Sequence, residues 1–398
     1  MHGRHLTLFF IVALCLPVAA QEAGSQSVEP WPWIDPPGAE SITLLLMGDT
    51  NIQNRADPGN AYQYVLPTLQ AADLRFTNLE GPLAGTSKDP RLPDIPHKSR
   101  WTHSEPEMVQ GLVAAGIDVV GVANNVTYPW QALLRSLEVL DANGIKHTGG
   151  GLDLEEAHQP VIVEREGVRF GFIQYTATYW PFQHAAGPET PGAATVKVDT
   201  YYKPPPQVLD KPGQPPLILT IPDPASLQRM VDDIRRLRRS ADVVVASYHW
   251  GVSNTTEMVE FQRTIGRAAI DAGADIVMGH GPHVFQPVEV WKGRPIFYSL
   301  ANFVFDWEIM RKAPDGLLVR VAVQDGRLAR VAAVPLRRNA DKDPVLLDPN
   351  EGVGQELYRQ LVELSGGGAA PLRLEGREIV VTGIGGVAGE PSGSGERP

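Results

Sequence analysis

Six side chains able to bind a divalent metal ion each follow a short apolar run of the sequence. They are Asp49, Glu80, Asn125, His249, His280 and His283. Carboxylate and amide oxygens and imidazole nitrogens form a mixed donor set suited to such an ion. The single cysteine, Cys15, lies in an apolar stretch near the N-terminus, so we expect no thiolate ligand. The sequence therefore predicts a metal site with oxygen and nitrogen donors.

The apolar runs before these residues have the length and composition of buried strands. They span 42–47, 74–77, 118–123, 242–247 and 275–278. Segments with helical patterns lie between them, at 106–115, 130–142, 224–239 and 257–272. This alternation predicts α/β layers. Ligand sites of open α/β sheets lie beyond the carboxyl ends of the strands, so we expect the six donors to surround one cavity.

Turn residues predict three β-hairpins, around Glu166-Gly167, Lys292-Gly293 and Asp325-Gly326. Residues 181–223 break this regular rhythm, because prolines are spread through the whole segment. We expect most of it to lack regular packing. Long irregular segments inside a domain are either functional lids or plain loops, and the sequence favours neither.

The two ends of the chain differ in composition from the middle. Residues 1–20 combine a basic start, an apolar run at 6–16 and the small residues Val18-Ala19-Ala20, which predicts a signal peptide and export to the periplasm or the extracellular space. The apolar run is too short for a lasting transmembrane anchor. Residues 21–40 are expected to form a surface linker, and residues 387–398 a disordered tail.

Composition argues against other binding roles. The chain has 35 Lys+Arg against 46 Asp+Glu, a net charge of −11. Nucleic-acid binding requires a basic face to neutralise phosphates, so we expect no nucleic-acid partner. Three further histidines, His147, His158 and His184, lie in expected turns or in the proline-rich segment, and we expect surface roles for them rather than metal ligation.

Several of the donor residues belong to longer motifs. The motifs are Leu45–Asp49, Asn78–Leu83, Val122–Asn125, Ser247–Gly251 and the stretch Ile270–Phe303, which contains Gly279-His280-Gly281-Pro282-His283. Through them the chain resembles, over residues 41–308, the CapA family of poly-γ-glutamate capsule synthesis. That family is similar to the calcineurin-like metallophosphoesterases. The resemblance implies an αββα two-sheet sandwich, with a proline-rich insertion at 181–223 and a small α+β extension at 309–386.

The resemblance also implies an exported metal-dependent hydrolase with phosphoesterase-like chemistry, linked to capsule synthesis. The six donors would then hold two divalent ions of Mn, Fe or Zn, and Asn78 and Asn124 would orient the ligands from behind. The substrate would be an anionic surface polymer such as poly-γ-glutamate, or a phosphoester. A membrane-bound capsule-synthesis complex is the expected partner. Glu289 and Asn302 lie in matching motifs, but their chemistry alone indicates no role.

Two positions depart from the family pattern. Where the family has Asn-Asn-His, this chain has Asn124-Asn125-Val126, and the Asp expected three residues later is Pro129. In the metallophosphoesterases that His lies beside the reacting phosphate and donates a proton, which valine cannot do. His97 and His103 are candidate substitutes. The alternative is a non-catalytic assembly or polymer-binding subunit that keeps the fold and has lost the general acid.

Overall fold

Strand β1 (Ile42–Asn51) lies in the middle of the first of two large sheets and carries the first predicted donor. The computed structural model of the chain describes residues 29–38, 40–87, 94–95, 97–98 and 101–385. The expected signal peptide and C-terminal tail lie outside these residues. The described part of the expected linker follows the surface of the first sheet, where Trp31 is buried and its backbone N–H donates to Thr68 Oγ1.

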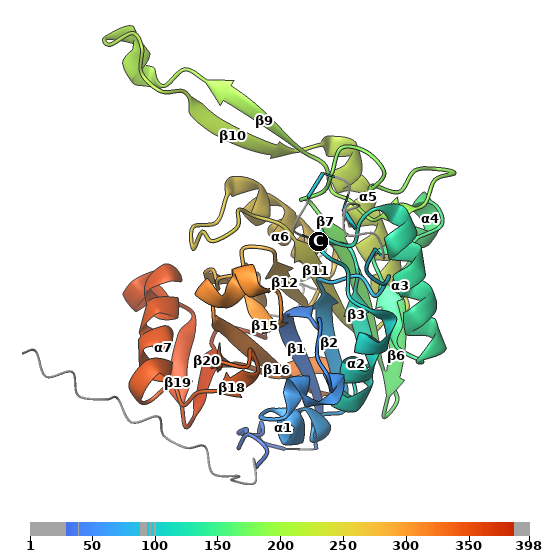
Figure 1. The fold of residues 1–398 in the computed structure, drawn as a ribbon. Coiled ribbons are helices and arrows are strands. Elements are labelled where there is room, and N and C mark those ends of the chain that lie inside the picture. Colours follow the sequence, from blue (N-terminus) through green and yellow to red (C-terminus); the bar gives the residue numbers. More distant parts are fainter. Residues whose placement is uncertain (1–28, 39, 88–93, 96, 99–100, 386–398) are drawn as a thin grey trace, which may run out of the picture.

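The first sheet combines strands from both ends of the chain (Figure 1). β1 pairs in parallel with β2 (Leu74–Leu79) and antiparallel with β16 (Asp315–Gln324). Beyond these lie β3 (Val119–Gly121) and β4 (Lys146–Thr148) on one side, and β17 (Arg327–Arg338), β20 (Glu378–Val381) and β19 (Leu372–Glu375) on the other. The short strands β15 (Asn302–Phe305) and β18 (Pro344–Leu346) pair with β1 and β17.

The second sheet is centred on β11 (Val243–His249), which pairs in parallel with β7 (Val168–Thr176) and β12 (Ile276–His280). Its outer strands are β6 (Val161–Arg165), β14 (Arg294–Phe297) and β13 (Val288–Trp291). The antiparallel pairs β6–β7, β13–β14 and β16–β17 are the three predicted hairpins, which are thus confirmed. The buried strands expected before the donor residues are also present.

Alternate side chains of the strands face different layers, as a sandwich requires. Leu44 and Leu46 of β1 belong to the core between the sheets, where Phe76 and Phe172 stack with ring centroids 5.4 Å apart. Leu45 of the same strand belongs instead to the core beneath the helices that cover the first sheet. A third core covers the outer face of the second sheet. The layers therefore follow the expected αββα order.

Helices cover both outer faces (Figure 1). The first sheet is covered by α1 (Leu66–Gln70), α2 (Val109–Ala115) and α3 (Trp130–Ala142), and the second by α5 (Pro224–Arg238) and α6 (Glu260–Ala272). α5 begins after the N-cap Asp223, whose carboxylate accepts from Ser226 N, with proline at the first helical position. Short α4 (Leu154–Ala157) precedes β6, and α7 (Gly352–Leu364) adds Leu357 and Leu361 to the core between the sheets. In the described ranges, no helix has the length and apolarity needed to cross a membrane.

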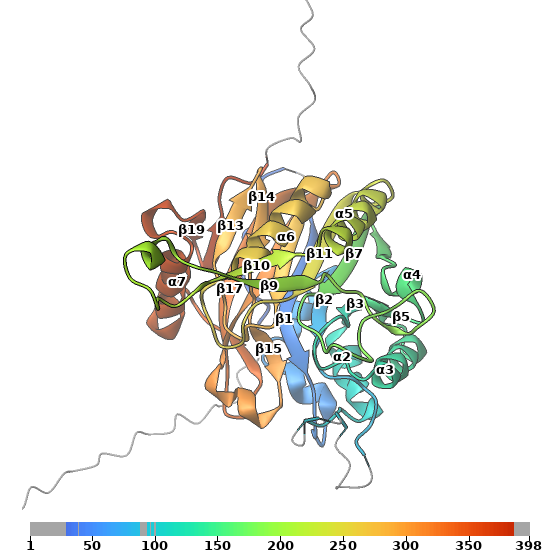
Figure 2. The ribbon, with the colours of Figure 1, turned by 90° about the horizontal axis from the view of Figure 1, so that it is seen from above.

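Most of 181–223 lacks regular secondary structure, as expected, but part of the segment is regular. β9 (Val198–Lys203) and β10 (Leu217–Pro222) form an antiparallel hairpin, here called the arm, which extends away from the body and overhangs it on the side of α6 (Figures 1 and 2). The prolines lie mainly in the connection between the strands, where no ladder hydrogen bond is lost. The strands themselves are rich in β-branched and aromatic residues, which favour extended backbone.

We predict that the outer part of the arm contributes little to stability. Thr200 and Thr220 are cross-strand partners, so the residues between them can be replaced by a two-residue Asn-Gly turn that suits a hairpin. Because Tyr202, Leu209 and Ile218 are mostly exposed, their removal loses little buried surface. We expect a melting temperature within about 2 °C of the wild type by differential scanning calorimetry, as is usual for surface changes. A fall of 10 °C would show that the outer arm packs on the body.

Candidate metal centre

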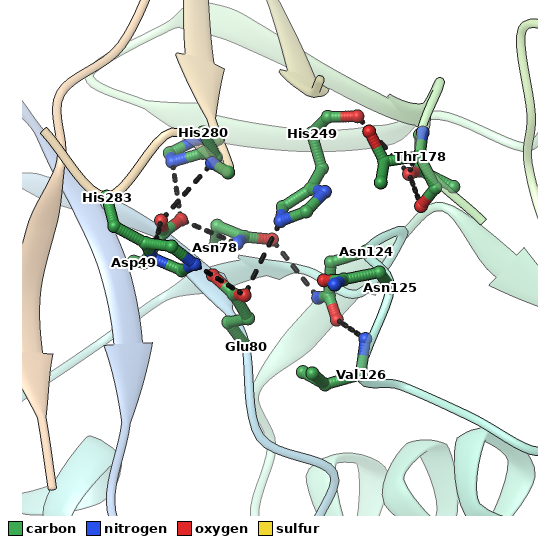
Figure 3. A network of polar contacts seen from close by, with 12 residues as sticks. Asp49, Asn78, Glu80, Asn124, Asn125, Val126, Thr178, His249, His280 and His283 are labelled. Carbon is green, nitrogen blue, oxygen red and sulfur yellow. Dashed lines mark hydrogen bonds and ion pairs between the residues drawn. The ribbon is translucent and has the colours of Figure 1, made fainter. Parts of the chain in front are cut away.

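Five of the six predicted donors come together at the carboxyl ends of the central strands of both sheets (Figure 3). Asp49 lies in β1, and Glu80 follows β2 in the same sheet. His249 and His280 end the neighbouring strands β11 and β12, where they are register partners, and His283 follows in the next loop. All five side chains are buried. The site therefore lies between the two sheets.

Close contacts join carboxylates of the first sheet to imidazoles of the second. His280 Nδ1 lies 3.1 Å from Asp49 Oδ1, and His283 Nδ1 lies 3.5 Å from Asp49 Oδ2. Glu80 Oε1 lies 3.5 Å from His249 Nε2 and 3.7 Å from His283 Nε2. One donor atom each from Asp49, Glu80 and His283 fall within 4.8 Å of one another, which is close enough to share a metal ion. We call these five residues the donor cluster.

Several atoms of the donor cluster have no hydrogen-bond partner although they are buried. They are both ring nitrogens of His249, both ring nitrogens of His280, and Glu80 Oε2. Buried polar atoms in folded proteins are nearly always paired, because an unpaired one loses its water without compensation. Nitrogen and carboxylate atoms gathered in one place are the donors that bind a transition-metal ion. The residues present therefore fit a metal site.

The protonation states of the donor cluster also fit a metal site. Burial raises the pKa of Asp49, but the surrounding imidazoles of His280, His283 and His249 outweigh burial and bring its pKa below the ordinary value. Burial lowers the pKa of His249 to about 4, so its ring is neutral at pH 7. Burial and the Asp49 charge raise the pKa of Glu80 well above the ordinary value. An ionised carboxylate and a neutral imidazole are the forms that bind metals, and a cation beside Glu80 would favour its ionised form too.

Asn78 and Asn124 make hydrogen bonds to the donor cluster and to the backbone next to it, respectively. Asn78 Nδ2 donates to Asp49 Oδ1 at 2.8 Å, and Asn78 Oδ1 accepts from Gln174 Nε2 at 2.9 Å. Asn124 Nδ2 donates to Leu79 O at 2.8 Å. These contacts fix the Asp49 carboxylate and the backbone just before Glu80. Asn78 therefore orients the Asp49 carboxylate, and Asn124 holds the backbone that leads to Glu80.

Two further positioning residues are Asn302 and Gln174. Asn302 Oδ1 accepts from His283 Nδ1 at 2.9 Å, which leaves Nε2 of that ring free to face Glu80. Gln174 lies near the end of the mostly buried strand β7, where it contacts Asn78 and also accepts from Ala123 N at 2.7 Å. In the sequence, Gln174 could have been recognised as the single amide side chain in the apolar run of β7. Glu289 lies elsewhere, where it binds Arg267 and Tyr298.

Two glycines allow the backbone to pass close to Asp49. A Cβ on Gly48 would lie 2.0 Å from Ala301 O, so only glycine permits this crossing of β1 with the segment before β15. Gly281 has φ +101°, and its N–H points to Asp49 Oδ2 at 3.3 Å. His283 also has a left-handed φ of 60° although it is not a glycine. Unfavourable backbone of this kind is often found at functional sites.

Asn125, the sixth predicted donor, is not joined to the cluster by any hydrogen bond or ion pair in the described residues. Figure 3 shows it next to Asn124, in the loop that follows β3. Its Oδ1 is buried and lacks a hydrogen-bond partner, so it remains available as a ligand. The neighbouring Val126 is buried, and its backbone N–H donates to Asn124 Oδ1 at 3.2 Å.

His97 and His103 were the suggested substitutes for the missing histidine. Among the described residues, neither makes a hydrogen bond or an ion pair with the donor cluster. His103 Nε2 lies 2.9 Å from Tyr128 O, and because a carbonyl only accepts, this nitrogen must carry the proton. Burial lowers the pKa of His103, so the ring is neutral and its Nδ1 is a lone-pair acceptor. His97 is exposed and lies against Trp180, with ring centroids 4.1 Å apart.

The expected surface positions are wrong for His158 and His184, which are both buried. His158 Nδ1 lies 2.7 Å from Asp233 Oδ2 in the core beneath α5. His184 Nε2 donates to Asn124 O at 3.0 Å, and His184 Nδ1 accepts from Trp180 N at 3.0 Å. The proline-rich segment therefore returns a histidine to the loop of Asn124, a long-range contact that local composition does not show.

Fold and site together define an αββα sandwich with a candidate metal centre between its two large sheets. The profile of the family described as bacterial capsule synthesis protein PGA_cap matches residues 43–307. The chain therefore belongs to this family, and the resemblance to CapA proteins is confirmed.

Individual relatives agree with this assignment. The capsule biosynthesis protein CapA of Bacillus anthracis is 27% identical, and the alignment covers 83% of this chain and 75% of that protein. The PGA biosynthesis protein CapA of Bacillus subtilis is 29% identical over 69% of this chain and 64% of that protein. A crystal structure of a novel phosphatase from Mycoplasma pneumoniae superposes on 75% of this chain and 94% of that one, with 13% identity and a TM-score of 0.44.

We predict that metal removal lowers the stability of the wild-type protein. An ion that binds only the native state at 100 times its dissociation constant adds about 2.7 kcal/mol. Chelation should thus lower the melting temperature by roughly 5 °C or more. His280→Ala should abolish this sensitivity, whereas His147→Ala, which changes a histidine outside the donor cluster that contacts Asp141, should preserve it. Identical melting curves of the wild type with and without chelator would contradict a bound ion.

We also predict that protonation of His184 destabilises the fold. Burial lowers its pKa from 6.5 to about 4, so the unfolded chain binds more protons between these pH values and stability falls as the pH decreases from 6.5 to 4. This shift corresponds to about 3 kcal/mol. His184→Gln keeps one donor and one acceptor but does not titrate, so urea unfolding should show a smaller pH dependence for this variant. Equal slopes for the two proteins would refute the assignment.

Proposed function

We propose that the protein is an exported metal-dependent hydrolase of the capsule-synthesis family, acting on an anionic surface polymer such as poly-γ-glutamate or on a phosphoester. The observation that carries the proposal is that the buried ring nitrogens of His249 and His280 lack hydrogen-bond partners and lie close to the carboxylates of Glu80 and Asp49. The names of the Bacillus relatives support the link to capsule and poly-γ-glutamate synthesis.

Neighbouring residues fix two members of the cluster in this proposal. Asp49 is held by Asn78 and Gly281 and presents a fixed anionic ligand. Asn302 sets the His283 ring so that Nε2 faces the site. The donor set suits Mn, Fe or Zn, and the family resemblance favours two ions, with Asn125 as the sixth ligand. When bound, such ions supply an activated water and stabilise developing negative charge.

Among the described residues, the site lacks an evident proton donor for the leaving group. Val126 stands where the family has its histidine, and its side chain neither donates nor accepts a proton. His103 holds its only ring proton against Tyr128 O, so it does not replace the missing donor. The protein should therefore act best on substrates whose leaving group departs as a stable anion.

We predict that the wild type cleaves aryl phosphate esters slowly and alkyl phosphate esters hardly at all, with both rates dependent on metal. General-acid help is worth about 10²–10⁴-fold for a basic leaving group and little for an acidic one. Val126→His should therefore raise the alkyl rate much more than the aryl rate in steady-state assays, and Val126→Leu serves as the apolar control. Comparable alkyl and aryl rates in the wild type would show that another group supplies the proton.

A non-catalytic role is the second candidate, and Val126 is the observation that favours it. In that role the protein is an assembly or polymer-binding subunit of a membrane-bound capsule-synthesis complex and keeps the metal without turnover. Elemental analysis of protein purified without chelator, followed by assays with bis(p-nitrophenyl) phosphate, separates the two functions. Metal-loaded but inert protein favours the subunit, and metal-dependent release of nitrophenol favours the hydrolase.

A further inference from the structure

The arm has one strand edge that no other described strand covers. β9 and β10 form a two-stranded sheet of their own, and β9 has no further ladder partner in the described part of the chain. β10 is the strand that lies beside α6, whereas β9 lies on the other side of the hairpin (Figures 1 and 2). An isolated two-stranded hairpin is only marginally stable in water, and an open edge is a template for another strand. The outer edge of β9 is therefore a candidate interface.

The body of the protein leaves both faces of β9 accessible. Tyr201 is 52% exposed on one face, and Tyr202 is 69% exposed on the other. Thr200 and Lys203 are exposed as well. Pro204 follows the strand and has no N–H, so the edge that can join a ladder ends at Lys203. A partner strand therefore has about six residues of β9 with which to pair.

One face of β9 carries an acid, an aromatic ring and a base at alternate positions, which are Asp199, Tyr201 and Lys203. A lysine at a strand edge usually discourages pairing, unless an acid lies opposite it. Two copies of this strand in an antiparallel register centred on Tyr201 place Asp199 of each copy opposite Lys203 of the other. Tyr201 then faces Tyr201 of the second copy at the two-fold axis. The charge pattern is therefore complementary to itself.

Both charged groups are available to a second copy. In the described part of the chain, Lys203 makes no ion pair. Asp199 Oδ1 lies 2.9 Å from Lys197 Nζ, in a pair whose side chains are 36% and 54% exposed. A carboxylate has about four lone-pair sites on its two oxygens, so Asp199 can accept from Lys197 and also from Lys203 of the second copy.

Other ways of joining two β9 strands lack this complementarity. Parallel in-register pairing places Asp199 beside Asp199 and Lys203 beside Lys203. A shift by two residues that keeps the two-fold symmetry places Lys203 opposite either Tyr201 or Lys197. Like charges directly opposite one another destabilise a sheet. The antiparallel register centred on Tyr201 is thus the one that the charges favour.

We propose that the arm is a docking site for a second copy of this chain, in which the two β9 strands pair antiparallel about Tyr201 to form a four-stranded sheet. Because both copies use the same surface, the assembly closes as a dimer. The strands run in opposite directions and each arm extends away from its body, so the two bodies lie at opposite ends of the shared sheet (Figure 1). The donor cluster takes no part, and the proposal does not rest on the proposed function.

Sedimentation equilibrium of the full chain measures this association. The wild type should dimerise reversibly at concentrations up to about 300 µM, because small interfaces bind weakly. Lys203→Asp and Asp199→Lys each place like charges opposite one another at two positions, so each should weaken self-association at least about tenfold. An equimolar mixture of the two variants restores both opposite-charge contacts and should form heterodimers. Lys146→Asp makes the same charge change on β4, outside the arm, and should dimerise as the wild type does.

Disulfide trapping tests the register separately. In a chain with Cys15 replaced, Tyr201→Cys should form disulfide-linked dimers under mild oxidation, because each introduced thiol faces its counterpart across the two-fold axis. Thr200→Cys places its thiol on the other face of the arm, opposite Tyr202 of the second copy. This control should therefore cross-link at least about tenfold more slowly.

The charge variants should fold, because the side chains that they change on the arm are exposed or partly exposed. The chain whose arm is shortened by a turn between Thr200 and Thr220 is the monomer reference. The proposal is overturned if the wild type stays monomeric, if the mixture of charge variants does not associate, or if both thiol variants cross-link at the same rate. Dimerisation of the shortened chain at the wild-type level would likewise refute it, by placing the interface on another surface.

Discussion

Burial of the Asp49 carboxylate between two sheets is the constraint on which the rest of the structure depends. A fully buried anion is costly unless hydrogen bonds and opposite charges surround it. Here the compensation comes from both sheets, through Asn78 of the first and through His280 and Gly281 of the second. The sheets therefore pack in the one arrangement that brings these groups together. Stability of the sandwich and geometry of the site are consequences of the same contacts.

The sequence was sufficient for the layers and for most of the site. Strands with apolar runs and polar ends place Asp49, Glu80, His249 and His280 at one edge, because parallel strands carry their carboxyl ends to the same side. His283 follows from its spacing after His280. The sequence predicted that Asn125 lies in the loop after β3. The orientation of its side-chain amide depends on tertiary packing, which the sequence pattern does not contain.

The remaining errors share one physical cause, which is contact between segments distant in the chain. Asn302 reaches His283 only because β15 pairs with β1, and Gln174 reaches Asn78 only because the two sheets face each other. His184 is buried because a proline-rich segment returns to the loop of Asn124. The proline content predicted irregular backbone in this segment. Because most of the prolines lie between β9 and β10, the two strands still form a hairpin. Composition averages over a segment, but folding depends on individual positions.

The arm offers a site for chemical labelling or immobilisation of the protein. The connection between β9 and β10 lies far from the two large sheets (Figure 1), and it contains the exposed residue Lys211. The chain contains one cysteine, Cys15, so a Lys211→Cys variant with Cys15 replaced would carry a single thiol. A dye, spin label or surface linker attached there would report on or immobilise the protein without touching the donor cluster. The feature that contributes least to the core is thus the best place for chemical attachment.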